Sequence, residues 1–186
     1  SLYWGYEPSE RSVKISVVQP NVPCYDEERV AASMENPLPV LLELMEDVPE
    51  ESKFVLLPES SLAYLPQIRT IDESETRLYS SLLEMLHGAE NDDMKIIAGA
   101  STVRYYDVAA TETARKSDFG YYYDLYNSAL LVDAEGDVEQ IYHKQKLVIG
   151  VEAIPFRKLL KNFKVDLGGV SGQLGWGERH VVFENG

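Results

Sequence analysis

Residues 142–156 read YHKQKLVIGVEAIPF, a stretch in which charged side chains stand among apolar ones. Lys144 and Glu152 are separated mainly by the aliphatic residues Leu147, Val148, Ile149 and Val151. Charged side chains are rarely buried unless they are paired or functional. A lysine in such surroundings predicts a nearby carboxylate that balances its charge.

The candidate for that carboxylate lies upstream, in residues 53–61, KFVLLPESS. The apolar residues of this segment indicate a strand, which delivers Glu59 directly after Pro58. Glu59 at a strand end, Lys144 in a loop and Glu152 shortly after it together form a candidate polar site. The alternative, from the pattern alone, is an ordinary set of surface charges.

The composition is that of a globular protein. The chain has 186 residues, of which 45% are hydrophobic and 26% charged, enough for one domain with its own core. Its 17 basic and 31 acidic residues give a net charge of −14, which argues against nucleic acid and against electrostatic docking on anionic lipid. The single cysteine, Cys24, excludes an intramolecular disulfide, and no Cys or His spacing indicates a metal site.

Strand and helix patterns alternate along the chain. Strands are expected at residues 13–19, 53–57, 94–102, 120–132 and 137–143. Helices are expected at 37–48 and 73–87, with shorter ones from Glu27 to Met34 and from Pro155 onward. Residues 104–119 predict an exposed, mobile connection, and the glycine-rich residues 166–177 a flexible arm. This alternation favours a parallel or mixed sheet layered by helices.

Three segments resemble motifs of the carbon–nitrogen hydrolase (nitrilase) superfamily, in the same order: LPESS at 57–61, YNSALLVD at 126–133 and YHKQKLVIGVEAIPF at 142–156. They are most similar to the nitrilase-like domain of apolipoprotein N-acyltransferases, where the pieces read roughly WPET, YNS and Y-x-K-x-x-LVPFGE-x-x-P. Residues 149–151, IGV, depart from the usual Pro-Phe-Gly, so the loop carrying Glu152 is expected to differ in shape. The resemblance implies an α/β fold, the nitrilase-like four-layer α-β-β-α sandwich, incomplete at the C-terminus.

The resemblance also implies a place within a longer protein. Residues 1–12 would link a preceding transmembrane helix to residues 13–186, a partial nitrilase-like domain. Tyr3, Trp4 and Tyr6 fit such a linker, because aromatic residues gather where a chain leaves a bilayer; a frayed arm is the alternative. The domain would face the periplasm at a bacterial inner membrane and be attached to it through segments outside this chain. Its partners would be a phospholipid acyl donor and a lipoprotein acceptor.

Nitrilase-type acyl transfer needs a thiolate that attacks a carbonyl, a carboxylate that removes the thiol proton and a cation that stabilises the oxyanion. The resemblance assigns the base to Glu59 and the oxyanion cation to Lys144. Glu152 would be a second acid that orients Lys144 or shuttles protons. A carboxylate in a tight pocket can have its pKa raised toward neutrality, as a general base requires. No cofactor and no metal are implied.

The nucleophile is not found after Lys144. In the family the catalytic cysteine follows the lysine in an I-C-Y-E-like strand, but residues 144–186 contain no cysteine. Cys24 matches no family motif, and Ser60 and Ser61 lack the G-x-S-x-G context of a serine nucleophile. We therefore expect this chain alone to be inactive. A soluble nitrilase or amidase and a non-catalytic nitrilase-fold binding domain are the alternative functions.

Overall fold

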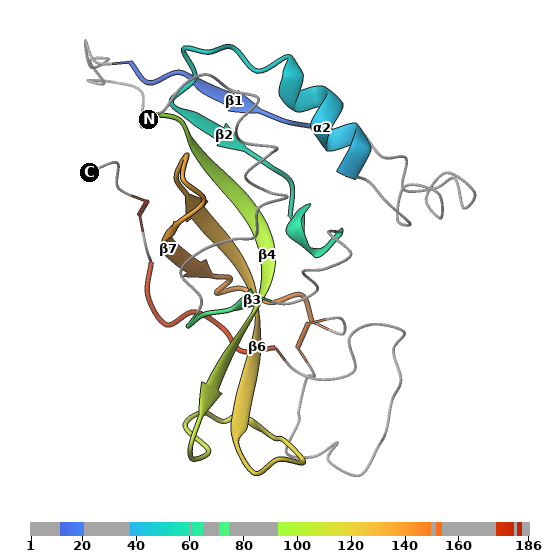
Figure 1. The fold of residues 1–186 in the computed structure, drawn as a ribbon. Helices are drawn as coiled ribbons and strands as arrows, with labels where there is room; N and C mark the ends of the chain where they lie inside the picture. Colours follow the sequence, from blue (N-terminus) through green and yellow to red (C-terminus); the bar gives the residue numbers. More distant parts are fainter. Residues whose placement is uncertain are drawn as a thin grey trace, which may run out of the picture.

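The computed structural model describes residues 12–20, 38–59, 61–64, 71–74, 93–149, 152–153, 174–180 and 182–183. These residues form one mixed, seven-stranded sheet with a helix beside it (Figure 1). The elements in chain order are β1 (Ile15–Val17), α2 (Leu38–Glu46), β2 (Phe54–Leu56), η1 (Ser61–Tyr64), β3 (Ile71–Asp72), β4 (Lys95–Tyr106), β5 (Arg115–Lys116), β6 (Tyr122–Val132) and β7 (Val138–His143). The predicted α/β class is confirmed, whereas the four-layer sandwich stays a prediction.

The sheet has the strand order β1-β2-β4-β6-β5, with β3 also beside β4 and β7 also beside β6. Strands β1, β2 and β4 run parallel, and β4 pairs with β6 in the antiparallel sense. The long β4–β6 ladder extends from Ile96↔Val132 to Tyr106↔Tyr122 and forms the spine of the molecule (Figure 1). Because residues on a strand alternate between the two faces, this register decides which side chains share a face.

One face of the sheet carries the hydrophobic core. Its fully buried members come from β2, β4 and β6 and include Val55, Ala98, Leu130 and Val132. Helix α2 adds the buried Leu41 to the same cluster, and η1 adds Leu62. Figure 1 shows α2 lying beside β1 and β2. The helix therefore covers one end of the sheet, as its spacing of leucines predicts.

The connection expected at 104–119 is more ordered than its sequence indicates. Residues 104–106 continue β4, Arg115–Lys116 forms β5 against β6, and Thr113 is buried. The Thr111 hydroxyl donates a hydrogen bond to the buried Asp124 carboxylate, 2.5 Å away. Most of the segment is exposed, as expected, but residues 104–106 and 115–116 belong to strands that the sequence did not predict there.

Several expectations fall outside the described residues. These are the helix at 27–34, residues 75–87 of the helix expected at 73–87, the helix after Pro155, residues 166–173 of the glycine-rich arm, and the residues Cys24 and Ser60. Within the part of the chain that is described, no helix is both long and apolar enough to span a membrane.

Candidate active site

Four polar side chains arrive at one place from separate elements. Glu59 follows β2, Asn127 lies on β6, Lys144 comes directly after β7, and Glu152 lies in the next loop. The Lys144 amide donates a hydrogen bond to the Asn127 carbonyl, 2.8 Å away, which continues the β6–β7 ladder by one step. The sheet register thus fixes the lysine backbone beside Asn127.

The Lys144 ammonium lies between the two glutamates. Its Nζ atom is 3.0 Å from Glu59 Oε1 and 3.0 Å from Glu152 Oε1. The Asn127 amide donates to the same two oxygens, at 2.6 Å and 2.7 Å. The structure therefore brings Glu59, Lys144 and Glu152 together, while their catalytic roles stay predictions.

Asn127 is the member of the site whose role the sequence did not reveal. It belongs to the YNSALLVD segment that resembles a family motif, so the sequence marked the stretch but gave the residue no function. The Oε1 atom of each glutamate accepts one hydrogen bond from Asn127 and one from Lys144. The amide therefore holds the two carboxylates in place around the lysine.

The electrostatics of Glu59 differ from the expectation. The hydrogen bond from Asn127 lowers the pKa of Glu59 most, and the hydrogen bond from Lys144 lowers it further. The Glu59 side chain is 64% exposed, and burial, which would raise its pKa, has a smaller effect than either hydrogen bond. The pKa of Glu59 is therefore not raised toward neutrality in this structure, in which Glu59 is a stabilised carboxylate.

Glu152 and Lys144 are also held in their charged forms. Burial alone would raise the pKa of Glu152, but the Val148 amide, Asn127 and Lys144 outweigh it and lower that pKa. The Val148 N–H donates to Glu152 Oε2 at 2.7 Å. For Lys144, burial would lower the pKa, yet the hydrogen bonds to the two glutamates outweigh it and raise the pKa. The resting site thus holds one ammonium and two carboxylates.

Residues 174–177, LGWG, form backbone hydrogen bonds with both Glu152 and Lys144. The Leu174 amide donates to the Glu152 carbonyl at 3.0 Å, and the Gly177 amide donates to the Lys144 carbonyl at 3.1 Å. At Gly177 a Cβ atom would overlap the His143 carbonyl, and at Gly175 it would overlap the Tyr126 ring. The flexible-arm expectation is therefore wrong for residues 174–177, where the glycines permit close contact with the sheet.

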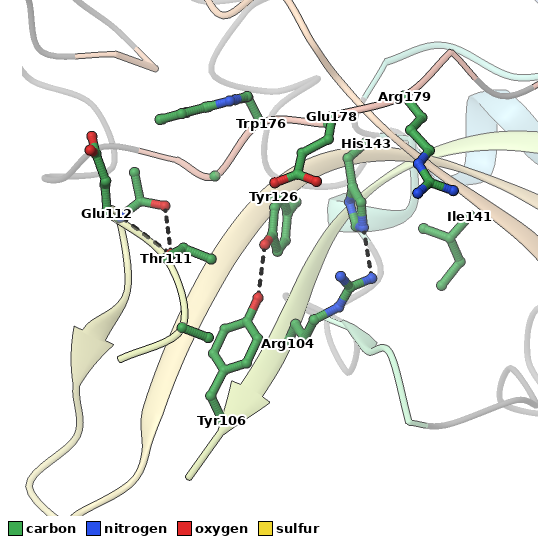
Figure 2. Close-up of a pocket in the computed structure, with 14 residues that line it drawn as sticks. Arg104, Tyr106, Thr111, Glu112, Tyr126, Ile141, His143, Trp176, Glu178 and Arg179 are labelled. Carbon is green, nitrogen blue, oxygen red and sulfur yellow. Dashed lines mark hydrogen bonds between the residues drawn. The ribbon is translucent and has the colours of Figure 1, made fainter. Parts of the chain in front are cut away.

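A cavity lies on the opposite face of β6. Side chains alternate along the strand, so Tyr126 and Ser128 point away from the face that carries Asn127. The cavity has a volume of about 630 Å³, and Figure 2 shows Arg104, Tyr126, His143 and Trp176 around it. Burial, followed by the hydrogen bond with Tyr106, raises the pKa of Tyr126, which therefore stays neutral.

Comparisons with known proteins do not identify a function for this chain. No protein-family model matches the chain, and no curated protein matches it. One solved structure with a similar fold is described as the crystal structure of N-terminal amidase with Asn-Glu-Ala peptide. The similarity has 18% sequence identity and a TM-score of 0.40, and it covers 73% of this chain and 29% of that chain. A likeness at this level carries no argument about activity.

Proposed function

We propose that Glu59, Lys144 and Glu152 are the base, the oxyanion cation and the second acid of a nitrilase-type acyl-transfer site. One observation supports this most: the Lys144 ammonium is 3.0 Å from both carboxylates, although Glu59 is 85 residues away in sequence. A preorganised ammonium is an effective stabiliser of the negative charge that develops on a carbonyl oxygen. The sheet supplies that preorganisation, because Lys144 is anchored to β6 through its own amide.

In the proposed reaction, Glu59 moves the protons and Lys144 stabilises the negative charge. A cysteine thiol, supplied by sequence outside these 186 residues, gives its proton to Glu59, and the thiolate attacks the acyl carbon. Lys144 donates a hydrogen bond to the oxyanion, and the leaving group takes the proton from Glu59 as the carbonyl reforms. In the second half, an amine attacks the thioester carbon and loses a proton to Glu59; the C–S bond breaks, and Glu59 returns that proton to the sulfur.

The lowered pKa of Glu59 must be reconciled with its role as a base. In the resting site, hydrogen bonds from Asn127 and Lys144 keep Glu59 ionised. A substrate carbonyl that engages Lys144 would draw the ammonium away from Glu59 and exclude water. Both changes raise the proton affinity of a carboxylate, so Glu59 becomes a stronger base when substrate is bound.

The more specific form of this proposal is that the chain is part of an apolipoprotein N-acyltransferase at the bacterial inner membrane, with this domain on the periplasmic face. Its support is the order of three motif-like segments, at 57–61, 126–133 and 142–156, whose polar residues Glu59, Asn127, Lys144 and Glu152 meet in space. The acyl group would pass from a phospholipid to the thiol, then to the N-terminal amine of a lipoprotein. A soluble amidase would use the same residues with water as the acceptor.

A non-catalytic binding domain is the second candidate. It is favoured by the lowered pKa of Glu59, since a stabilised carboxylate paired with Lys144 is also what a structural ion cluster contains. The two candidates differ in what substitution does. A structural cluster controls folding stability, whereas a catalytic one controls rate while the fold persists.

The test uses the full-length protein that carries this segment together with its cysteine. Lys144→Ala should reduce acyl transfer by about 10²–10³, the usual loss for an oxyanion donor. Glu59→Gln should reduce it by about 10²–10⁴, the usual range for a general base. Transfer from phospholipid to a lipoprotein amine is measured in membranes, with release of the free acid followed in parallel to detect hydrolysis.

Matched controls change exposed residues of the same type elsewhere in the chain. Lys146→Ala and Glu135→Gln change residues that are exposed, and both variants should retain the parent rate. Circular dichroism should show that all four variants are folded. Full activity in both Lys144→Ala and Glu59→Gln would overturn the catalytic assignment, and hydrolysis without transfer would favour an amidase.

A further inference from the structure

A closed ring of hydrogen bonds lies on the sheet face opposite the candidate site. Its members are Glu73, Thr102, Ser128, His143 and Arg104. Thr102 and Ser128 are almost fully buried, and the side chains of Glu73 and His143 are only 7% and 13% exposed. Buried polar groups of this kind are expensive to leave unpaired, so the ring is a built feature.

The direction of each hydrogen bond follows from the donors that are present. The Thr102 hydroxyl donates to Glu73 Oε1 at 2.9 Å, so Ser128, 2.8 Å from Thr102, must donate to it. The Ser128 hydrogen is then used, so His143 Nδ1, 3.1 Å away, carries a hydrogen and donates to Ser128.

Arg104 closes the ring. Its Nη2 donates to His143 Nε2 at 3.2 Å, and its Nε donates to Glu73 Oε2 at 2.6 Å. Figure 2 shows the Arg104–His143 contact at the edge of the cavity. The His143 ring is therefore the neutral tautomer with hydrogen on Nδ1, and every donor assigned in the ring has an acceptor.

The ring reaches the candidate site through the backbone. His143 is the last residue of β7 and is registered against Ser128, while the next residue, Lys144, is bonded to Asn127. Strand alternation sends the His143 side chain to one face and the Lys144 side chain to the other. Any change in the angle or register of His143 therefore changes the direction in which Lys144 points.

We propose that this ring positions Lys144. Because the ring fixes His143 against β4 and β6 on one face of the sheet, it sets the direction in which the Lys144 ammonium approaches Glu59 and Glu152 on the other face. The biological meaning of this role rests on the proposed function, but the positioning itself is a property of this chain. Arg104, His143 and Glu73 are positioning residues, since none of their side chains contacts Lys144, Glu59 or Glu152 within the described hydrogen bonds and ion pairs.

The test compares two substitutions of Thr102, which lies on the opposite face of the sheet from the ammonium. Thr102→Val keeps the shape but removes the hydroxyl, whereas Thr102→Ser keeps the hydroxyl and is the matched control. In Thr102→Val, the Lys144 amide should exchange with solvent about tenfold faster relative to the core amides of β4, as local loss of hydrogen bonding predicts. NMR of isotope-labelled lysine should also show the Lys144 ammonium pKa moving down toward that of an exposed lysine.

Thr102→Ser should leave both signals unchanged. A second pair covers the case in which Thr102→Val does not fold: His143→Gln retains an acceptor near Arg104, and His180→Gln alters an exposed histidine. His143→Gln should speed Lys144 exchange, and His180→Gln should not. If Thr102→Val and His143→Gln speed hydrogen exchange equally at all amides, or leave the exchange rate of the Lys144 amide unchanged, the positioning role is overturned.

These readouts need no enzymatic activity. If the full-length parent protein proves unable to transfer acyl groups, the proposed function fails while the effect of the ring on Lys144 stands. If the parent protein is active but the exchange and pKa of Lys144 do not respond to changes in the ring, the positioning role fails while the proposed function stands.

Discussion

At the scale of single residues, the candidate site is a balance between two carboxylates and the donors that hold them. Glu59 and Glu152 each direct an oxygen at the same ammonium, and carboxylates that share a site repel one another. Lys144 offsets that repulsion with charge, and Asn127 offsets it with the two hydrogens of one amide. Accordingly, the hydrogen bond from Asn127 lowers the pKa of Glu59 more than the hydrogen bond from Lys144 does.

We predict that Asn127→Leu, which preserves the size of the side chain, raises the pKa of Glu59, because it removes the interaction that lowers this pKa most. A carboxyl group with a lowered pKa contributes stability that is present above its ordinary pKa and lost as the pH falls through the folded-state value. The Asn127→Leu variant should therefore lose less stability than the parent between neutral pH and acid. Carboxyl NMR titration and urea unfolding at several pH values measure these two effects.

The variant Asn127→Gln is the companion to this test, since it keeps an amide but moves it by one methylene. An unchanged Glu59 titration in Asn127→Leu would contradict the role given to this amide.

The approach of Glu59 to Lys144 could be predicted from sequence, because a charged residue among apolar ones needs a partner and strand ends gather at one edge. The part played by Asn127 could not, because a polar residue within a strand does not reveal which face it occupies.

At the scale of elements, the 174–177 segment connects the two loops of the site. It takes the place beside β6 that β7 leaves, with a bridge between Tyr126 and Gly175. Its amides reach carbonyls of Leu125, Lys144 and Glu152. This close approach is possible because neither Gly175 nor Gly177 carries a Cβ atom.

Gly177→Ala should loosen this segment and the Lys144 loop together. The added Cβ would overlap the His143 carbonyl, a backbone atom that cannot rotate away. We expect a loss of about 1–3 kcal/mol, the usual range for overpacking, measured by urea unfolding. Glu178→Ala, an exposed change in the adjoining position, is the control and should stay within about 0.5 kcal/mol of the parent. Equal stability of the two variants would show that the segment does not press on β7.

The elements differ in how far their sequences predict them. The β-branched and apolar runs of β2, β4 and β6 gave strands at the expected places, since burial on a pleated surface selects such residues. Residues 107–116 have no such run, and their order comes from Thr111 bonding to Asp124 across the turn. The glycines at 175 and 177 indicate flexibility when read alone, but they are required here by a tertiary contact that local patterns do not contain.

At the scale of the whole molecule, the two faces of the sheet are unequal. The core face carries Val55 of β2, fully buried, and the adjacent strand β1 places Ser16 beside it. The opposite face of β1 carries Ile15 and Val17, which are 53% and 67% exposed. In the described sheet β1 also ends the strand order, so apolar side chains and an open edge coincide.

This coincidence predicts that the chain self-associates through β1. An edge strand with exposed apolar residues is a template for pairing, and a charge on it opposes pairing. Val17→Lys should therefore shift sedimentation velocity profiles toward the monomer at micromolar concentrations, with a change in monomer stability within about 0.5 kcal/mol, because the side chain is exposed. Val108→Lys makes the same substitution at 68% exposure, outside the sheet, and should leave association as it is in the parent chain. Equal effects of the two lysines would mean that the added charge acts through the net charge of −14 and not through the edge. A parent chain that stays monomeric across the concentration series would show that the exposed face of β1 does not pair with another copy.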